Sequence, residues 1–424
     1  MLSIRVFFQK VENVKILGII CEYNPLHNGH LYQMTQAREK SGADAVVCVM
    51  SGNYVQRGEL AITDKWTRTG MALAAGADLV IELPTLFAMS GAQSFARAGV
   101  RLLLEAGVDT ISFGCESENL ELLGKIAGIL REEPEGYQRV LREKLDAGES
   151  FAVARSAALQ QCCAEQAEEV ACILDQPGAI LGIEYLAALA ELGADKEVIL
   201  IPRQGNGHRE TQGQGQYVSA STIRTALKSG QWLSEAMPEK VQSLWQEANS
   251  LGKTMPRQDV FTQQLYWRLA EFEVWQLQQT PEIGEGLENR ILQCASQVKN
   301  WDDLVQEIVC KRYPAARIRR GLMNFCLGIN QEVRYRAGWE EGPSYTRILG
   351  IGPAGGAVLR RMKSEGTLPI LTNPGAQLGE LSPVGRQLFA EEVKFTDYYM
   401  LALPGQRWYN RGLEYRMEIV KKQK

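Results

Sequence analysis

The first half of the chain alternates short apolar runs with longer amphipathic stretches, and this pattern strongly limits the folds open to it. The apolar runs have the length and composition of buried strands and cover 16–21, 45–50, 79–82, 110–113 and 198–201. Strands that alternate with helices form a parallel sheet with helices on both faces. We therefore predict an α/β fold with a Rossmann-like, doubly wound parallel sheet. In such sheets ligands bind at the carboxyl ends of the strands, where the strand order reverses.

Two histidines lie where the first predicted strand gives way to a helix predicted over 31–40. They belong to the sequence His27-Asn28-Gly29-His30. The first turn of a helix attracts phosphate through its unpaired N–H groups and its partial positive charge. Residues three apart project from one side of that turn, and Gly29 lets a nucleotide approach the backbone. The pattern predicts a triphosphate site in which both imidazoles donate to phosphate oxygens. The alternative is two polar residues that only cap a helix.

A second helix start follows a Gly- and Gln-rich stretch over 204–216, which contains the third histidine, His208. Ser219 and Ser221 open this helix, which we expect to end near Ser229, and Arg224 lies in its first turns. Hydroxyl groups, backbone N–H groups and a guanidinium suit the distal phosphates of a nucleotide. An ordinary N-cap is the alternative for the serines, and His208 is equally compatible with a loop residue that has no role.

Composition limits the classes of protein that remain. The chain has 424 residues, a net charge of −4 and no apolar run long enough for a membrane span. Its first 15 residues lack the features of a secretory signal, and its nine cysteines include no C-x-x-C. We expect reduced thiols, a cytoplasmic location, and no bound structural metal. Nucleic acid could bind only through a local basic patch.

The composition and pattern of the sequence change near Met237-Pro238, after which helical patterns, tryptophan and charged residues become more frequent. We predict a nucleotide-binding domain over 1–237 and a mostly helical domain over 238–424. Within the second, a run over 311–320 concentrates five cations, which are candidates for contacting RNA phosphates or ordinary surface charges: Lys311, Arg312, Arg317, Arg319 and Arg320. A G-x-G-x-x-G at 350–355 is interpreted as a tight hairpin before a helix, because no long strand is evident before it.

Several sequence blocks together resemble one known family. They are H-x-G-H within 22–30, the later S-x-S-T-I-R at 219–224, and the blocks 50–59, 64–66, 76–84 and 180–185. The chain is similar to the bacterial tRNA(Met) cytidine acetate ligase family, within the H-I-G-H nucleotidyltransferase superfamily. The resemblance implies that ATP adenylates acetate with release of pyrophosphate. The acetyl group then passes to the wobble cytidine of elongator tRNA(Met) and gives N4-acetylcytidine.

The resemblance also implies positions for the ATP site, with His27 and His30 as the catalytic pair. The implied positions are Ile20, Cys21, Glu22, Tyr23, Asn24, Pro25, Leu26, His27, Asn28, Gly29, His30, Leu31, Tyr32, Gln33, Gly114, Gly178, Arg203, Ser219, Ser221 and Arg224. Gly178 stands where the family commonly has asparagine, and Gln176 is the expected substitute. Leu26 stands for the usual phenylalanine, a change of packing. Magnesium as a companion of ATP, the oligomeric state and the general base are left open by the sequence.

Arg57 and Lys65 follow the second predicted strand and are candidates for lining the acetate or cytidine pocket, or for exposed surface. Two other functions remain to be weighed. A small-molecule adenylyltransferase would share the H-x-G-H but would not need the basic helical region. A non-catalytic RNA-binding protein could retain a degenerate nucleotide pocket, but it would not need to keep both ends of a phosphate site.

Overall fold

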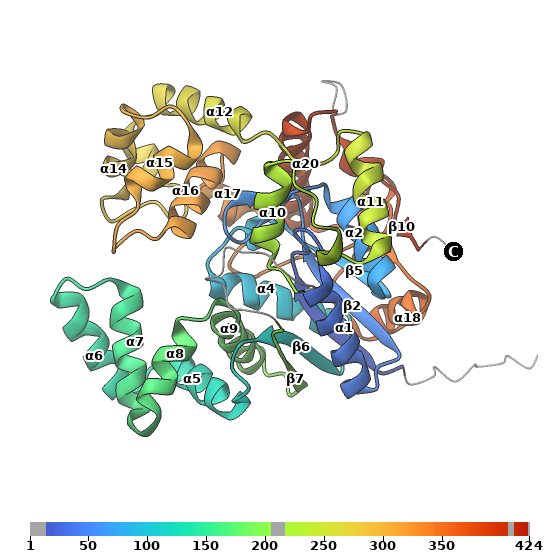
Figure 1. Ribbon diagram of the computed structural model, residues 1–424, viewed down its shortest axis with the longest axis horizontal. Coiled ribbons are helices and arrows are strands. Elements are labelled where there is room, and N and C mark those ends of the chain that lie inside the picture. The colour runs from blue at the N-terminus through green and yellow to red at the C-terminus, as the bar shows by residue number, and fades with distance from the viewer. Residues whose placement is uncertain (1–13, 205–216, 406–410, 423–424) are drawn as a thin grey trace, which may run out of the picture.

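The computed structural model describes residues 14–204, 217–405 and 411–422. Its centre is an eight-stranded sheet in the order β10-β8-β5-β2-β1-β6-β7, with β9 paired to β8 (Figure 1). A separate two-stranded hairpin joins β3 to β4. The strands are β1 Ile16–Cys21, β2 Ala45–Ser51, β3 Tyr54–Val55, β4 Glu59–Leu60, β5 Leu79–Leu83, β6 Thr110–Cys115, β7 Glu197–Pro202, β8 Thr346–Ile351, β9 Ile370–Leu371 and β10 Val420–Lys421.

The five strands predicted from the apolar runs all form, and they are mutually parallel. From β1 the chain adds β2 and β5 on one side, and then crosses over to add β6 and β7 on the other. The strand order therefore reverses next to β1, which is the place where an open parallel sheet binds its ligands. The doubly wound α/β prediction is confirmed.

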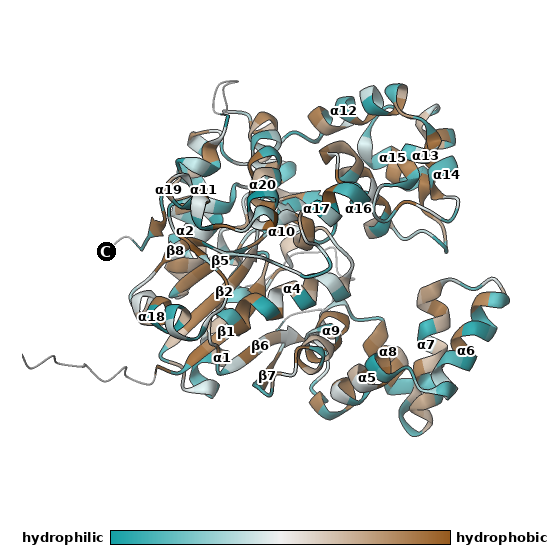
Figure 2. Cartoon of the chain, turned by 180° about the vertical axis from the view of Figure 1, so that it is seen from behind, coloured by the Kyte–Doolittle hydropathy of each residue, from teal (hydrophilic) through white to brown (hydrophobic). Residues whose placement is uncertain are grey.

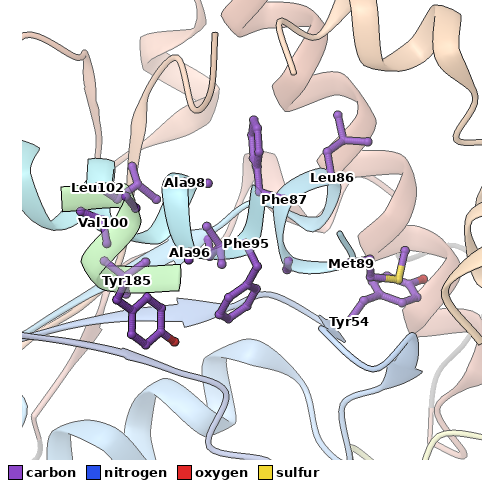
Figure 3. Packing of buried hydrophobic residues seen from close by; sticks show 14 of the residues in the cluster. Tyr54, Leu86, Phe87, Met89, Phe95, Ala96, Ala98, Val100, Leu102 and Tyr185 are labelled. Atoms are coloured by element: carbon purple, nitrogen blue, oxygen red, sulfur yellow. The ribbon is translucent and has the colours of Figure 1, made fainter. Parts of the chain in front are cut away.

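Strand residues face two hydrophobic layers in alternation, because successive side chains of a strand point to opposite faces. In β2, Val47 and Val49 join one buried cluster, while Val46 and Cys48 join the other. Figure 2 shows the apolar strands enclosed by helices whose outer faces are polar. Figure 3 shows side chains of α3 and α4, among them Phe95, packed over the first of these layers. The sheet is buried on both sides, so its central strands need no polar face.

Helices make up most of the rest of the chain, and several begin at a capping side chain that the sequence supplies. They are α1 Asn28–Ser41, α2 Lys65–Ala75, α3 Thr85–Ala88, α4 Ala92–Glu105, α5 Leu120–Glu132, α6 Glu135–Asp146, α7 Phe151–Cys162, α8 Ala167–Leu174, α9 Pro177–Glu191, α10 Ala220–Lys228, α11 Glu239–Ser250, α12 Gln258–Glu271, α13 Val274–Gln278, α14 Leu287–Ala295, α15 Trp301–Ile308, α16 Ala315–Leu327, α17 Gln331–Arg336, α18 Gly355–Glu365, α19 Pro374–Gln377 and α20 Pro383–Ala402. The short 3₁₀ turns are η1 Ala164–Gln166, η2 Ser234–Ala236, η3 Leu378–Glu380 and η4 Leu413–Tyr415.

Two helical lobes extend from the same side of the sheet, as Figure 1 shows. One contains α5 to α8 and is formed by residues 120–174. The other contains α12 to α17. No single helix in the described part of the chain is long and apolar enough to cross a membrane, although 164–174 and 177–191 reach that length and composition as a pair bent by 113°.

The segment after Pro238 does more than add helices, because it also completes the sheet. Strand β8 pairs antiparallel with β5, and β10 pairs with β8. The segment predicted as a mostly helical domain, 238–424, consists mainly of helices but also supplies β8, β9 and β10 to the sheet. Strand β8 was not predicted, and its partner β5 lies far away in sequence.

The G-x-G-x-x-G segment is not a hairpin, because it links strand β8 to helix α18. Asp78, at the start of β5, occupies this junction: its Oδ1 accepts the N–H of Ala354 at 3.1 Å. A Cβ atom on Gly352 would lie 2.7 Å from the carbonyl oxygen of Ala77, and one on Gly355 would overlap that of Asp78. The glycines allow two backbones to pack closely, so the motif has a structural explanation.

Candidate active site

Helix α1 begins at Asn28, three residues earlier than predicted, because the two histidines cap it. Nδ1 of His27 accepts the N–H of Gly29 at 3.1 Å, and Nδ1 of His30 accepts the N–H of His27 at 3.3 Å. This reciprocal pair is a capping box made of imidazoles. The two rings stack with centroids 3.8 Å apart. Gly29 is required here, since a Cβ atom would lie 2.9 Å from His27 Cε1.

The environment keeps both imidazoles neutral. Burial, with Arg203 and Arg224 nearby, lowers the pKa of His27 to about 4. Burial also lowers the pKa of His30 well below its ordinary value, and His27 and Arg203 add to the shift. A neutral imidazole whose Nδ1 accepts a hydrogen bond carries its proton on Nε2. Each histidine therefore has one Nε2–H that it can donate to a ligand, and its backbone partner fixes that tautomer.

The second helix start lies beside the first. Ser219 caps α10 by accepting the N–H of Thr222 at 3.2 Å, and its hydroxyl group is 2.9 Å from that of Ser221. From the same helix, Nη1 of Arg224 donates to the carbonyl oxygen of Asn24 at 2.9 Å. The predicted second half of the phosphate site is thus attached to the loop that leads into α1. His208 lies outside the described residues.

Strands β6 and β7 place a third group at the same edge of the sheet. Gly114, the last residue but one of β6, lies next to Arg203, whose side chain would be 3.7 Å from a Cβ atom on this glycine. Nη1 of Arg203 pairs with Oε1 of Glu116 at 3.2 Å. Arg203 also helps to lower the pKa of both histidines. The two imidazoles and two cations, with one carboxylate beside Arg203, therefore lie at the switch point of the sheet.

Arg68 holds the neighbouring strand ends in place. It is fully buried, and it donates to the carbonyl oxygens of Glu22 at 2.7 Å, Ser51 at 3.0 Å and Thr63 at 3.1 Å. The carboxylate of Glu22 accepts the N–H of Gln56 at 2.8 Å. Burial raises the pKa of Glu22, although that hydrogen bond and the cations Arg224 and Arg57 oppose the rise.

Comparison with known proteins connects this geometry with a family. Residues 14–412 match the model of the family described as HIGH Nucleotidyl Transferase. A tRNA(Met) cytidine acetate ligase of Acetivibrio thermocellus is 36% identical over 414 residues, covering 96% of this chain and 100% of the relative. The chain belongs to the tRNA(Met) cytidine acetate ligase family of HIGH nucleotidyl transferases. A ligase of the same name from a Thermoanaerobacter species is 38% identical over 390 residues, covering 91% and 95% of the two chains.

Solved structures of a family member share the whole fold. A crystal structure of Thermotoga maritima TmcAL bound with alpha-thio ATP has a TM-score of 0.88 and 31% identity, and covers 97% of this chain and 100% of that one. The apo form of the same protein has a TM-score of 0.90 with equal coverage. The described residues of this chain include no group of three or more His, Cys, Asp or Glu side chains placed to hold a metal ion.

Gly178 is the position at which the resemblance to the ligase family implies an asparagine. A Cβ atom built there would overlap Oε2 of Glu116 and would lie 3.0 Å from Nη2 of Arg203. The substitute expected from the sequence, Gln176, instead donates to Sγ of Cys172 at 3.4 Å. Glu116, which the sequence gave no reason to single out, takes up the space beside Gly178. Leu26 is buried, in keeping with a packing role.

Lys65 lies in a different setting from the expected acetate or cytidine pocket or surface. It is fully buried at the start of α2, where its Nζ pairs with Glu82 at 2.5 Å and with Glu414. Burial opposes its charge, but Glu414, Glu82 and Glu392 outweigh that effect and raise the pKa of Lys65. This lysine joins α2 to β5 and to the C-terminal segment. Arg57, by contrast, is exposed on the turn between β3 and β4 and remains a candidate.

The basic run over 311–320 divides into two groups. Lys311 and Arg312 are exposed, just before α16. The other three arginines form ion pairs within the protein: Arg317 with Glu285 at 3.1 Å, Arg320 with Glu282 at 2.8 Å, and Arg319 with Glu59 at 3.8 Å.

Glu59 links this group to the nucleotide site. Its carboxylate also lies 3.4 Å from Nη2 of Arg224 in α10. Arg319 and Arg320 belong to the helix that packs against the β3–β4 turn, where a Cβ atom on Gly58 would overlap the backbone of Arg320. These two arginines therefore attach the α12–α17 lobe to the nucleotide site. Neither this link nor the role of Arg68 was evident from the sequence, because each depends on a contact between distant segments.

Proposed function

We propose that this protein uses ATP to activate acetate and then acetylates the wobble cytidine of elongator tRNA(Met). The observation that carries the proposal is the imidazole capping box at the start of α1, held beside Arg203 and Arg224 at the switch point of the sheet. It provides two fixed N–H donors and two cations at the place where such folds bind phosphate. Family membership supplies the substrates.

In the first step a carboxylate oxygen of acetate attacks the α-phosphorus of ATP. The bond from that phosphorus to the bridging oxygen breaks, and pyrophosphate leaves. Negative charge builds up on the α- and β-phosphate oxygens, and the Nε2–H groups of His27 and His30 stabilise it. Because both pKa values are depressed, these groups act as neutral hydrogen-bond donors and do not transfer protons.

In the second step the exocyclic amine of cytidine attacks the carbonyl carbon of acetyl-AMP. The bond from that carbon to the phosphate oxygen breaks, AMP leaves, and the amine loses a proton. A cytosine amine is a weak nucleophile, so prior activation of the acyl group is what makes the transfer feasible.

We propose that the α12–α17 lobe helps to hold the tRNA, with Lys311 and Arg312 as phosphate contacts and Arg57 near the entering cytidine. Arg319 attaches the lobe to the β3–β4 hairpin through Glu59, and Arg320 through the carbonyl oxygen of Gln56, whereas Arg317 pairs with Glu285 inside the lobe. We place the enzyme in the cytoplasm, since all nine cysteines lie in the described part of the chain and none forms a disulfide.

The deciding experiment supplies ATP, radiolabelled acetate and total bacterial tRNA to the wild type and to His27→Ala and His30→Ala. Label in N4-acetylcytidine that is lost in both variants supports the proposal. Acetate-dependent pyrophosphate release without label in RNA would point to another acceptor. An acetate-independent transfer of AMP to a small molecule would favour an adenylyltransferase, and ATP binding without either reaction would favour a non-catalytic RNA-binding protein.

A further inference from the structure

The carboxylate of Glu116 stands out in the nucleotide site because one of its oxygens has no partner. Oε1 pairs with Arg203, but Oε2 is buried and accepts no hydrogen bond from any residue in the described ranges. A buried carboxylate oxygen left without a donor is costly, and native proteins rarely keep one without a use. An incoming ligand that carries a donor would satisfy it.

Gly178 makes room for this carboxylate. Any side chain at that position would overlap Oε2 of Glu116, so the glycine at the start of α9 and the carboxylate at the end of β6 are complementary. Gly114, on the other side of Arg203, likewise leaves the backbone of β6 open. A ligand that lies over the ends of β6 and β7 therefore meets backbone and the guanidinium of Arg203, next to the carboxylate of Glu116.

The charges of the site set the direction in which a nucleotide lies. His27, His30 and Arg224 offer donors and positive charge at the start of α1, which suits the phosphates. A carboxylate only accepts hydrogen bonds and repels phosphate, so the end of the nucleotide at Glu116 must be uncharged and must carry O–H or N–H donors. The ribose is the first such group beyond the phosphates. An acidic side chain that accepts from a ribose hydroxyl group is a recurring solution in other nucleotide-binding sheets.

We infer that Glu116 recognises the ribose of ATP by accepting a hydrogen bond from a ribose hydroxyl group on Oε2. The inference rests on the proposed use of ATP and adds to it a residue that selects ribonucleotides over deoxyribonucleotides.

Calorimetric binding of ATP, 2′-deoxy-ATP and 3′-deoxy-ATP to the full-length protein tests this inference. We expect the wild type to bind ATP about tenfold or more tightly than the analogue that lacks the recognised hydroxyl group, as for a hydrogen bond to a charged acceptor. Glu116→Gln should reduce that preference to about threefold or less. Glu118→Gln is the matched control, because Glu118 is an exposed glutamate two residues away, and it should keep the wild-type preference.

Two further measurements separate ribose recognition from a general effect on the site. Inorganic tripolyphosphate has no ribose, so its affinity should be the same in the wild type and in Glu116→Gln. Gly178→Ala keeps the carboxylate but pushes it aside, and should also lose ribose preference, with an unfolding midpoint close to that of the wild type.

The inference is overturned if the wild type binds all three nucleotides equally, if Glu116→Gln or Gly178→Ala keeps the full preference, or if tripolyphosphate affinity changes as much as ATP affinity. It is also overturned if Glu116 instead controls discrimination against purine riboside triphosphate, which lacks the adenine amino group. Failure of the wild type to bind ATP at all would overturn the proposed function itself.

Discussion

The junction between β1 and α1 and the junction between β8 and α18 are built from the same parts. In each, a buried strand leads into a helix whose first turn contains a glycine. At the first, the imidazoles of His27 and His30 cap the helix and keep their Nε2–H groups for a ligand. At the second, Asp78 accepts the N–H of Ala354, and the glycines pack directly on the backbone of its own segment.

The difference shows that a glycine motif at a helix start does not by itself identify a nucleotide site. What matters is whether the protein fills the space in front of the helix. At α18 a carboxylate and a neighbouring backbone fill it, and the negative charge of Asp78 would also repel phosphate. At α1 the capping groups are neutral donors with cations beside them, so the space suits an anion.

The largest effect should come from removing the donors at the α1 junction. We expect His27→Ala and His30→Ala each to lower acetate-dependent pyrophosphate release by about 10² to 10³-fold, the usual loss for one preorganised donor to developing charge. Steady-state release with saturating ATP and acetate measures this. Gly356→Ala at the other junction is the control, since its Cβ atom meets nothing closer than Arg360 Nη1 at 3.9 Å. If the histidine variants release pyrophosphate at a rate within threefold of the wild type, the α1 junction is not the site of activation and does not differ from the α18 junction in function.

At the α18 junction the corresponding change should affect stability and leave the chemistry intact. Gly355→Ala forces a methyl group into the carbonyl oxygen of Asp78 and should lower the free energy of unfolding by about 1–3 kcal/mol. Urea unfolding measures the loss, again with Gly356→Ala as the matched control. A Gly355→Ala protein that is fully stable but fails to bind ATP would mean that the second junction is a ligand site after all.

The cations near the start of α16 differ in a similar way. Lys311 and Arg312, before the helix, are exposed, whereas Arg317, within it, is paired with Glu285. Lys311→Gln and Arg312→Gln should each weaken tRNA binding several-fold and reduce the slope of log affinity against log salt by roughly 0.7 to 0.9, the value for one lost phosphate contact. Arg317→Gln, whose guanidinium is paired with Glu285, should leave that slope unchanged. Equal slopes for all three variants would show that the exposed cations contact tRNA no more than the paired one does.

The smallest effect should be that of pH on the first step. With the pKa of His27 at about 4 and that of His30 also depressed, both are neutral from pH 6 to 8, so pyrophosphate release should show no gain as pH falls through 6.5. Depressed histidine pKa values mean that the stability they confer is complete above about pH 6.5 and is lost as pH falls toward 4. A rate that rises with protonation near pH 6.5 would show that a charged imidazole is needed.

Local pattern was enough to predict the five parallel strands, the two helix starts and the histidine pair, because each is specified within a few consecutive residues. It was not enough to predict the burial of Lys65. That burial depends on Glu82, Glu392 and Glu414, which are distant in sequence and surround the lysine in the fold. The placement of Glu116 likewise depends on a distant residue, Gly178 in α9. Strand β8 was missed because burial against β5, and not its own sequence, makes it a strand.

The pairing of β8 with β5 also has a consequence for synthesis on the ribosome. All five residues of β5 are buried in the finished fold, and one edge of this strand is covered only by a segment made much later. A nascent chain that has passed Pro238 therefore presents an open apolar edge until 346–351 emerges. Exposed edges of this kind invite pairing with other chains. The enzyme should depend on uninterrupted translation or on chaperones over the stretch that encodes the α12–α17 lobe.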